Sequence, residues 1–119
     1  MTYMNKVIDE AQRMYAPIFV DREATHDYEY NGLEIKKGQI INISLYAVHH
    51  DEDLYPEPDK FLPERERPSD YFMPFGNGPR SCIASRFIKL EIKLLLASIL
   101  SKYRFEKCHK TVVSIELYY

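Results

Sequence analysis

The sequence predicts an α+β fold, mostly helical, and three segments carry that prediction. Apolar residues recur at helical spacing over residues 3–15, near the N-terminus. Good strand formers, interrupted by turn signals, fill residues 24–44. A second and stronger helical pattern covers residues 83–103. The chain has 119 residues, enough for one domain, and residues 1–119 are expected to form a single unit.

The first helix is predicted from apolar residues on one face and from the proline that ends it. These apolar residues are Met4, Val7, Ile8, Ala11, Met14 and Tyr15. Pro17 ends the helix because its ring disfavours the α conformation in the preceding residue. Glu10 and Arg13 are three residues apart and can pair, but not on the apolar face. The spacing alone therefore favours a solvated surface pair, worth only about 0.2–0.5 kcal/mol.

Residues 24–44 are predicted to form β structure with two turns. Asn31-Gly32 is typical of a hairpin turn, and a lysine-glycine pair at residues 37–38 marks a second turn. The isoleucines at residues 40–43 favour a strand. Residues 51–71 are rich in proline and charge with little periodicity, which indicates an irregular connection rather than a linker between domains.

Residues 83–103 give the strongest helical pattern of the chain. Four residues mark the broad side that is predicted to be buried: Phe87, Leu90, Leu94 and Ala97. Three cations share the other side: Arg86, Lys89 and Lys93. Such cations usually form a solvated helix face, and the alternative is a docking patch for an acidic partner. A final strand is expected over residues 112–117.

The most specific chemistry lies in residues 72–84, a glycine-rich loop that leads into this helix. Gly76 and Gly78 can adopt positive φ and leave room for a flat ligand. The proline that follows them restricts the loop, so that Arg80 and Cys82 project in fixed directions. The positive end of the helix favours a thiolate, which is a metal ligand or a nucleophile. The alternative is a small buried hydrophobic residue, the commonest role of a lone cysteine.

The loop resembles the haem-binding loop of the cytochrome P-450 family, whose pattern is Phe-x-x-Gly-x-Arg-x-Cys-x-Gly. Phe75, Gly78, Arg80 and Cys82 stand at the matching places, and Ala84 stands where the family has glycine. The resemblance implies that Cys82 is the proximal thiolate ligand of haem b (iron protoporphyrin IX), as in a monooxygenase. It also implies that Arg80 pairs with a propionate and that Phe75 packs beside the sulfur. The methyl group of Ala84 is expected to alter how the haem is seated.

Two further segments resemble motifs of the same family. Glu10 and Arg13 have the spacing of its Glu-x-x-Arg signature and precede the cysteine by a similar interval. Phe-Leu-Pro-Glu-Arg at residues 61–65 resembles its Phe-x-Pro-Glu-Arg-Phe element, with Glu66 in place of the last phenylalanine. The resemblance implies that Arg65 joins Glu10 and Arg13 in a buried charged triad behind the haem. The expected role of this triad is structural, not catalytic.

Arg22 and the histidine pair are further candidates. Arg22 lies where the family often has a second propionate-binding arginine, and a surface arginine is the alternative. His49 and His50 are adjacent, so their side chains point in different directions and make poor joint metal ligands. We expect His49 to be structural or close to a propionate, and His50 to be exposed.

The resemblance implies that the chain is the C-terminal, haem-binding part of a P-450 domain of microsomal type. Such an enzyme inserts one oxygen atom from O2 into a small lipophilic substrate and receives electrons from NADPH–cytochrome reductase. It implies the endoplasmic reticulum membrane for the intact enzyme, although the apolar run at residues 94–100 is too short to span a bilayer. The formal charge of −2 gives no reason to expect nucleic-acid binding.

Two elements of such an enzyme are not expected among these residues: the oxygen-activation helix, which the resemblance would place before residue 3, and the substrate pocket. The isolated chain is therefore expected to be inactive. The alternative hypothesis is a non-catalytic, truncated module that binds haem or folds only with a partner.

Overall fold

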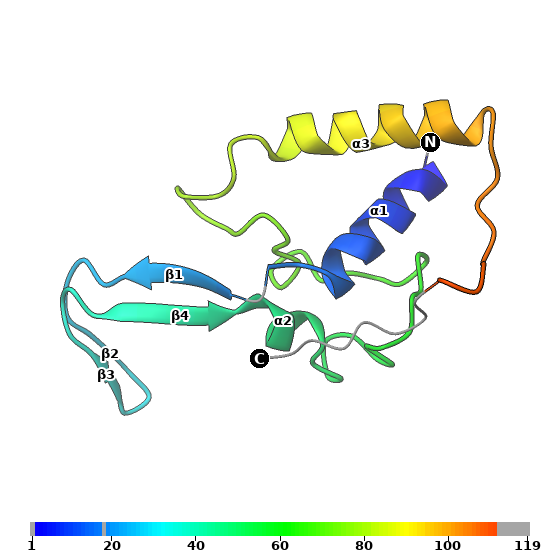
Figure 1. The fold of residues 1–119 in the computed structure, drawn as a ribbon. Coiled ribbons are helices and arrows are strands. Elements are labelled where there is room, and N and C mark those ends of the chain that lie inside the picture. The colour runs from blue at the N-terminus through cyan, green and yellow to red at the C-terminus, as the bar shows by residue number, and fades with distance from the viewer. Residues whose placement is uncertain (1, 18, 112–119) are drawn as a thin grey trace.

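The computed structural model describes residues 2–17 and 19–111. Within them it has the following elements: α1 (Thr2–Met14), β1 (Phe19–Glu23), β2 (Tyr28–Tyr30), β3 (Leu33–Ile35), β4 (Ile40–Ser44), α2 (Leu45–His49) and α3 (Ser85–Leu100). Helices α1 and α3 lie at one end, and the β ribbons extend away from them at the other (Figure 1). Helices and small antiparallel sheets agree with an α+β fold. Helices contain more residues than strands do. The fold is nevertheless not mostly helical, because the long connection between α2 and α3 is irregular.

Helix α1 begins and ends one residue before the predicted span. The amide of Tyr15 still donates to the carbonyl of Ala11, at 2.9 Å, before the chain turns away. Ile8 is only 5% exposed and Glu10 and Arg13 are fully buried. The solvated Glu10–Arg13 pair that the spacing alone favours is therefore wrong, and the burial of this pair that the resemblance implies is what the structure has. The connection that follows α2 covers this polar side of the helix, which the periodicity of the helix itself could not reveal.

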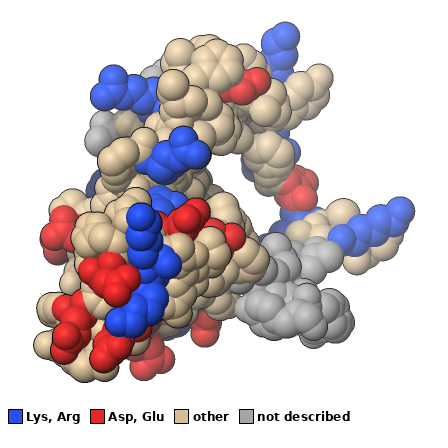
Figure 2. Space-filling model, turned by 90° about the vertical axis from the view of Figure 1, so that its left-hand side faces the viewer, with Lys and Arg blue, Asp and Glu red and all other residues tan. Residues whose placement is uncertain are grey.

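The strands form two separate antiparallel ribbons, β1 with β4 and β2 with β3. The predicted hairpin is confirmed, because Asn31 and Gly32 link β2 to β3 with φ of 49° and 79°. The β structure begins earlier than predicted, since Arg22 lies within β1 and faces Ile41 of β4. The β2–β3 hairpin faces the viewer in Figure 2, where acidic and basic side chains are intermixed. Lys36, directly after β3, pairs with two acidic side chains, those of Asp27 and Glu34.

Helix α2 is short and supplies much of the small core. The hydroxyl of Ser44 accepts from the amide of Ala47, at 3.2 Å, and so caps its first turn. Leu45 and His49 of α2 are buried, together with residue 55 of the connection. His50, predicted to be exposed, is half-buried because its ring stacks on Tyr46 at a centroid distance of 4.0 Å.

Helix α3 is shorter than the predicted span at both ends, and none of its residues is buried. Phe87, Leu90 and Leu94 are 67%, 56% and 57% exposed, so the prediction that they are buried is wrong. Ala97, on the same predicted side, is half-buried. The side of α3 toward α1 instead shares a shallow groove with it and contributes Ile92 and Leu96.

Two expectations concern the remainder of the chain. The strand expected over residues 112–117 lies outside the described residues. Among the residues that are described, α1, α2 and α3 all lack the combined length and apolar character needed to cross a membrane.

Candidate functional site

The cysteine loop, residues 72–84, presents the thiol of Cys82 on a backbone that is closed by a hydrogen bond. Gly76 and Gly78 have φ of 73° and 80°, which glycine adopts without the strain of a side chain. The amide of Cys82 donates to the carbonyl of Phe75, at 3.0 Å, and closes the loop. Phe75 is half-buried, whereas the side chain of Cys82 is exposed. The exposed thiol excludes the alternative of a small buried residue within the described structure.

The thiol lies further from the helix than the sequence indicates. Helix α3 begins at Ser85 rather than near residue 83, and Ala84 occupies the N-cap position with φ of −85° and ψ of 1°. The amide of Ser85 donates to the carbonyl of Cys82 at 3.3 Å. A short turn thus separates Cys82 from the helix. Because the methyl group of Ala84 cannot cap, the first amides of α3 gain no side-chain bond there.

The two arginines predicted to bind propionates differ in their surroundings. Arg80 is exposed and makes no hydrogen bond or ion pair within the described part of the chain. Arg22, on β1, donates from Nη2 to the carbonyl of Asn77, at 3.1 Å. The same atom lies 3.7 Å from the position that a Cβ on Gly76 would take. The structure therefore brings Arg22 to the cysteine loop, although the two are far apart in the sequence.

Glu10 is the centre of a buried group that we call the Glu10 cluster: Glu10, Arg13, Arg65 and Arg67. Oε1 of Glu10 accepts from Nη2 of Arg13 at 3.0 Å and from Nε of Arg65 at 3.1 Å. Oε2 accepts from Nη2 of Arg67 at 2.9 Å. The side chains of Glu10 and Arg13 are 0% exposed, and those of Arg65 and Arg67 are 5% and 11% exposed. The structure brings the three predicted residues together and adds Arg67.

Sequence reasoning missed Arg67. Its guanidinium also donates to the carbonyls of Lys6 and Pro63, both at 3.2 Å, and so ties the connection to α1. Its Cζ lies 5.9 Å from the centre of the Phe72 ring. The only sequence signal was the two-residue spacing from Arg65, which places side chains on one side of an extended segment. Nothing in the sequence indicated that both side chains turn toward Glu10.

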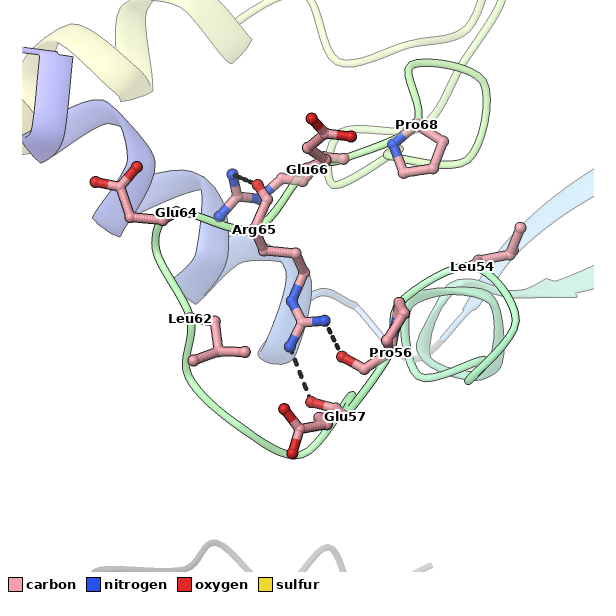
Figure 3. A pocket seen from close by; sticks show the side chains of 9 residues that line it. Leu54, Pro56, Glu57, Leu62, Glu64, Arg65, Glu66 and Pro68 are labelled. Atoms are coloured by element: carbon pink, nitrogen blue, oxygen red, sulfur yellow. Dashed lines mark hydrogen bonds between the residues drawn. The ribbon is translucent and has the colours of Figure 1, made fainter.

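The arginines of the Glu10 cluster also bind main-chain carbonyls of the connection. Arg65 donates to the carbonyls of Glu57, at 2.8 Å, and Pro56. Figure 3 shows its guanidinium pointing to these carbonyls, while the side chain of Glu66 points away. Glu66 is exposed, so the glutamate that replaces the family's phenylalanine adds no packing to the cluster. The open pocket beside Arg65, of about 770 Å³, is lined by both acidic and basic residues.

His49 links the cluster to the cysteine loop. Its carbonyl accepts from Nη1 of Arg13 at 2.7 Å, and its Nε2 accepts from the amide of Met73 at 3.1 Å. Burial lowers the pKa of His49 below its ordinary value of 6.5, which favours the neutral ring that can accept this bond. The predicted structural role of His49 thus has a defined geometry, through the backbone at the start of the loop.

The charge state of Glu10 follows from its hydrogen bonds. Burial alone would raise its pKa, but bonds from Arg13, from the amide of Leu62 and from Arg65 hold the pKa below the ordinary 4.5. Glu10 is therefore an anion at neutral pH, and its oxygens are occupied. Such a carboxylate supports structure, whereas the exposed thiol of Cys82 is available to bind a metal.

Comparison with known proteins identifies the family. The model of the family described as "Cytochrome P450" matches residues 1–117. Over 98% of this chain, thromboxane-A synthase of Rattus norvegicus is 40% identical, and cytochrome P450 3A2 of the same species is 37% identical. Cytochrome P450 6a2 of Drosophila melanogaster is 40% identical over 98% of the chain. The chain spans only about a quarter of the length of these relatives, 24–25%. It therefore belongs to the cytochrome P450 family, whose members use haem, iron protoporphyrin IX, as cofactor.

Proposed function

We propose that these residues are the C-terminal, haem-binding portion of a P450 domain, in which Cys82 is the proximal ligand of the iron. The intact enzyme would insert one oxygen atom from O2 into a small lipophilic substrate. The observation that carries the proposal is the exposed thiol of Cys82, presented by a loop whose backbone is held at Phe75. The match of residues 1–117 to the family supports it.

The residues of the loop fit a flat cofactor with acidic substituents. A Cβ placed on Gly78 would meet no atom within 4 Å, so the space beside the loop is open. Cys82 would hold the iron, and Arg22 and Arg80 would bind the propionates. When bound, a haem with a thiolate ligand supplies the activation of oxygen. Phe75 is half-buried within the loop that carries Cys82. Its ring would limit the access of water to the sulfur.

The Glu10 cluster would support this loop from behind without taking part in the reaction. It fixes the connection to α1, and His49 joins the cluster to Met73 at the start of the loop. A guanidinium bonded to both a carboxylate and main-chain carbonyls restrains the backbone on either side. The role proposed for Glu10, Arg13 and Arg65 is therefore to keep the loop rigid.

Haem ligation can be tested with the two exposed cysteines as a matched pair. The chain is mixed with hemin, reduced and exposed to carbon monoxide, and the Soret band is recorded. The unaltered chain and Cys108→Ala are expected to give a thiolate-type band, which Cys82→Ala loses, because only Cys82 lies in the loop. An unchanged band in Cys82→Ala, or a band lost in Cys108→Ala, would contradict the assignment of the ligand.

The partners of the intact enzyme are part of the same proposal. NADPH–cytochrome reductase would supply the electrons, and the endoplasmic reticulum membrane would be the location, as in microsomal relatives. The three cations of α3 were predicted to form a solvated helix face, with a docking patch as the alternative, and they do not all face solvent: Arg86 is exposed, Lys93 is half-buried, and Lys89 pairs with Asp9 of α1. A docking patch on α3 would therefore depend chiefly on Arg86.

A second candidate function is a module that folds fully only with a partner. The exposed apolar residues Phe87, Leu90 and Leu94 favour it, because an apolar helix face of this kind is usually covered. This hypothesis expects slow hydrogen exchange in α1 but rapid exchange in α3 when the chain is alone. Equal protection of both helices in the isolated chain would contradict it.

A further inference from the structure

Lys89 is turned toward the interior of the molecule rather than toward solvent. Its Nζ lies 2.9 Å from Oδ1 of Asp9, and the two side chains are 32% and 29% exposed. Asp9 immediately precedes Glu10 on α1. The ion pair therefore joins α3 to the helix that carries the centre of the Glu10 cluster.

The same ammonium group lies over two rings of the cysteine loop. It is 5.9 Å from the centre of the Phe72 ring and 5.8 Å from that of Phe75. Both distances are within the range of cation–π attraction. The carbonyl of Phe75 accepts the amide of Cys82, so the backbone that Lys89 restrains is the backbone that presents the thiol.

We propose that Lys89 is a positioning residue for Cys82. Its ammonium group, which is paired with Asp9 of α1, attracts the rings of Phe72 and Phe75 and so restrains the carbonyl to which the Cys82 amide is bonded. No other described cation of α3 has this arrangement, since the side chains of Arg86 and Lys93 make no hydrogen bond, ion pair or ring contact among the described residues. The consequence for the iron ligand rests on the proposed function, whereas the effect on the loop does not.

Hydrogen exchange of the Cys82 amide tests the proposal in the chain without haem. Lys89→Met keeps the length of the side chain but removes its charge, and is expected to raise the exchange rate of this amide about tenfold. Lys89→Arg restores the cation and is expected to recover most of the protection. Arg86→Met removes the same charge from the same helix and should leave the rate unchanged.

The pattern of exchange separates a local effect from general destabilisation. Amides of the β1–β4 ladder should exchange at the same rate in Lys89→Met as in the unaltered chain, because Lys89 does not contact that ladder. An unchanged Cys82 rate, or an equal rise in both places, would overturn the proposal. If Lys89→Met does not fold, Asp9→Asn is the variant that tests the proposal. A rise of about threefold in the exchange rate of the Cys82 amide would support the proposal, and an unchanged rate would overturn it.

A second measurement keeps this inference distinct from the proposed function. In the chain loaded with hemin, reduced and exposed to carbon monoxide, Lys89→Met should lower the fraction with a thiolate-type band, and Lys89→Arg should restore it. If Cys82→Ala leaves the band unchanged, the proposed ligand is wrong, but the exchange result without haem still decides the role of Lys89.

Discussion

The Glu10 cluster and the cysteine loop differ in how many of their polar side chains find hydrogen-bond partners among the described residues. Both carboxylate oxygens of Glu10 accept hydrogen bonds, and Glu10 and Arg13 have no exposed side-chain surface. In the cysteine loop, by contrast, the thiol of Cys82 and the side chain of Arg80 are exposed. In the first region the carboxylate finds its partners among the described residues, although Nε of Arg13 and Nε of Arg67 are buried without a hydrogen-bond partner there. The second region presents its thiol and its arginine outward.

This difference separates support from ligand binding. Buried charges tolerate little change because each depends on its partners, whereas an exposed thiol can be removed with little loss of folding energy. Substitutions in the two regions should therefore change different properties. Those in the Glu10 cluster should lower the free energy of unfolding, and those at Cys82 should change binding.

The largest effect is expected for Glu10→Gln. The substitution preserves size but leaves three buried or nearly buried guanidinium groups without their carboxylate. We expect it to lower the free energy of unfolding by about 3–5 kcal/mol, measured by urea denaturation. The matched control is Glu66→Gln, in an exposed side chain, which should change it by less than about 0.5 kcal/mol. Similar values for the two variants would show that the cluster is not an energetic centre.

Arg67→Met is expected to cost less, about 2 kcal/mol, because one charged hydrogen bond to Glu10 is lost while Arg13 and Arg65 remain. Urea denaturation again gives the value. In the Glu10→Gln background the cost should shrink, since the partner charge is already absent. Equal costs in the two backgrounds would mean that Arg67 acts through its carbonyl contacts rather than through the carboxylate.

A smaller effect is expected from pH, with two declines of the free energy of unfolding that start at different pH. The free energy of unfolding should be greatest above pH 6.5 and decline below it, because the unfolded chain protonates His49 more readily than the folded chain does. A second decline should begin below pH 4.5, where the unfolded chain protonates Glu10 while the folded cluster retains the carboxylate. Urea denaturation across this pH range measures both.

The two declines can be assigned by substitution. His49→Gln should abolish the decline that starts near 6.5 and leave the decline below 4.5, to which Glu10 contributes together with Glu57, whose pKa is lowered by the hydrogen bond from Lys60. A persistent upper decline in this variant would assign it to another group.

The smallest effect is expected for Leu94→Ala on α3. Leu94 is 57% exposed, so its truncation should change the free energy of unfolding by less than about 0.5 kcal/mol. Leu45→Ala, at a residue only 1% exposed, is the control and should cost about 2–5 kcal/mol. A large cost at Leu94 would show that the apolar side of α3 is covered in solution, for example by self-association, which sedimentation would detect.

Local signals predicted the fold best. The turn at Asn31-Gly32 depends on two adjacent residues that accept positive φ, and the structure has it. The cysteine loop is also local, and its glycines have the backbone expected of them. The start of α3 was predicted less accurately, because the apolar pattern continues before Ser85 although the helix begins only there.

Burial was harder to predict because it depends on distant segments. Glu10 appeared solvated from its own helix, yet the connection of residues 56–67 encloses it. Phe87 appeared buried from its own helix, yet no described segment covers it. Only the family resemblance indicated the enclosure of Glu10, and neither periodicity nor resemblance indicated Arg67.

The bonds from arginines to main-chain carbonyls affect which sequence changes this region can accept. Arg13 and Arg65 bind the carbonyls of Pro58 and Glu57, and every amino acid supplies a carbonyl. The identities of most of residues 56–60 can therefore drift, provided that the path of the backbone is kept; residue 57 is more restricted, because Glu57 has φ of 55°. An insertion or deletion there would displace several acceptors at once. We thus expect this connection to vary in composition among related proteins while its length stays nearly fixed.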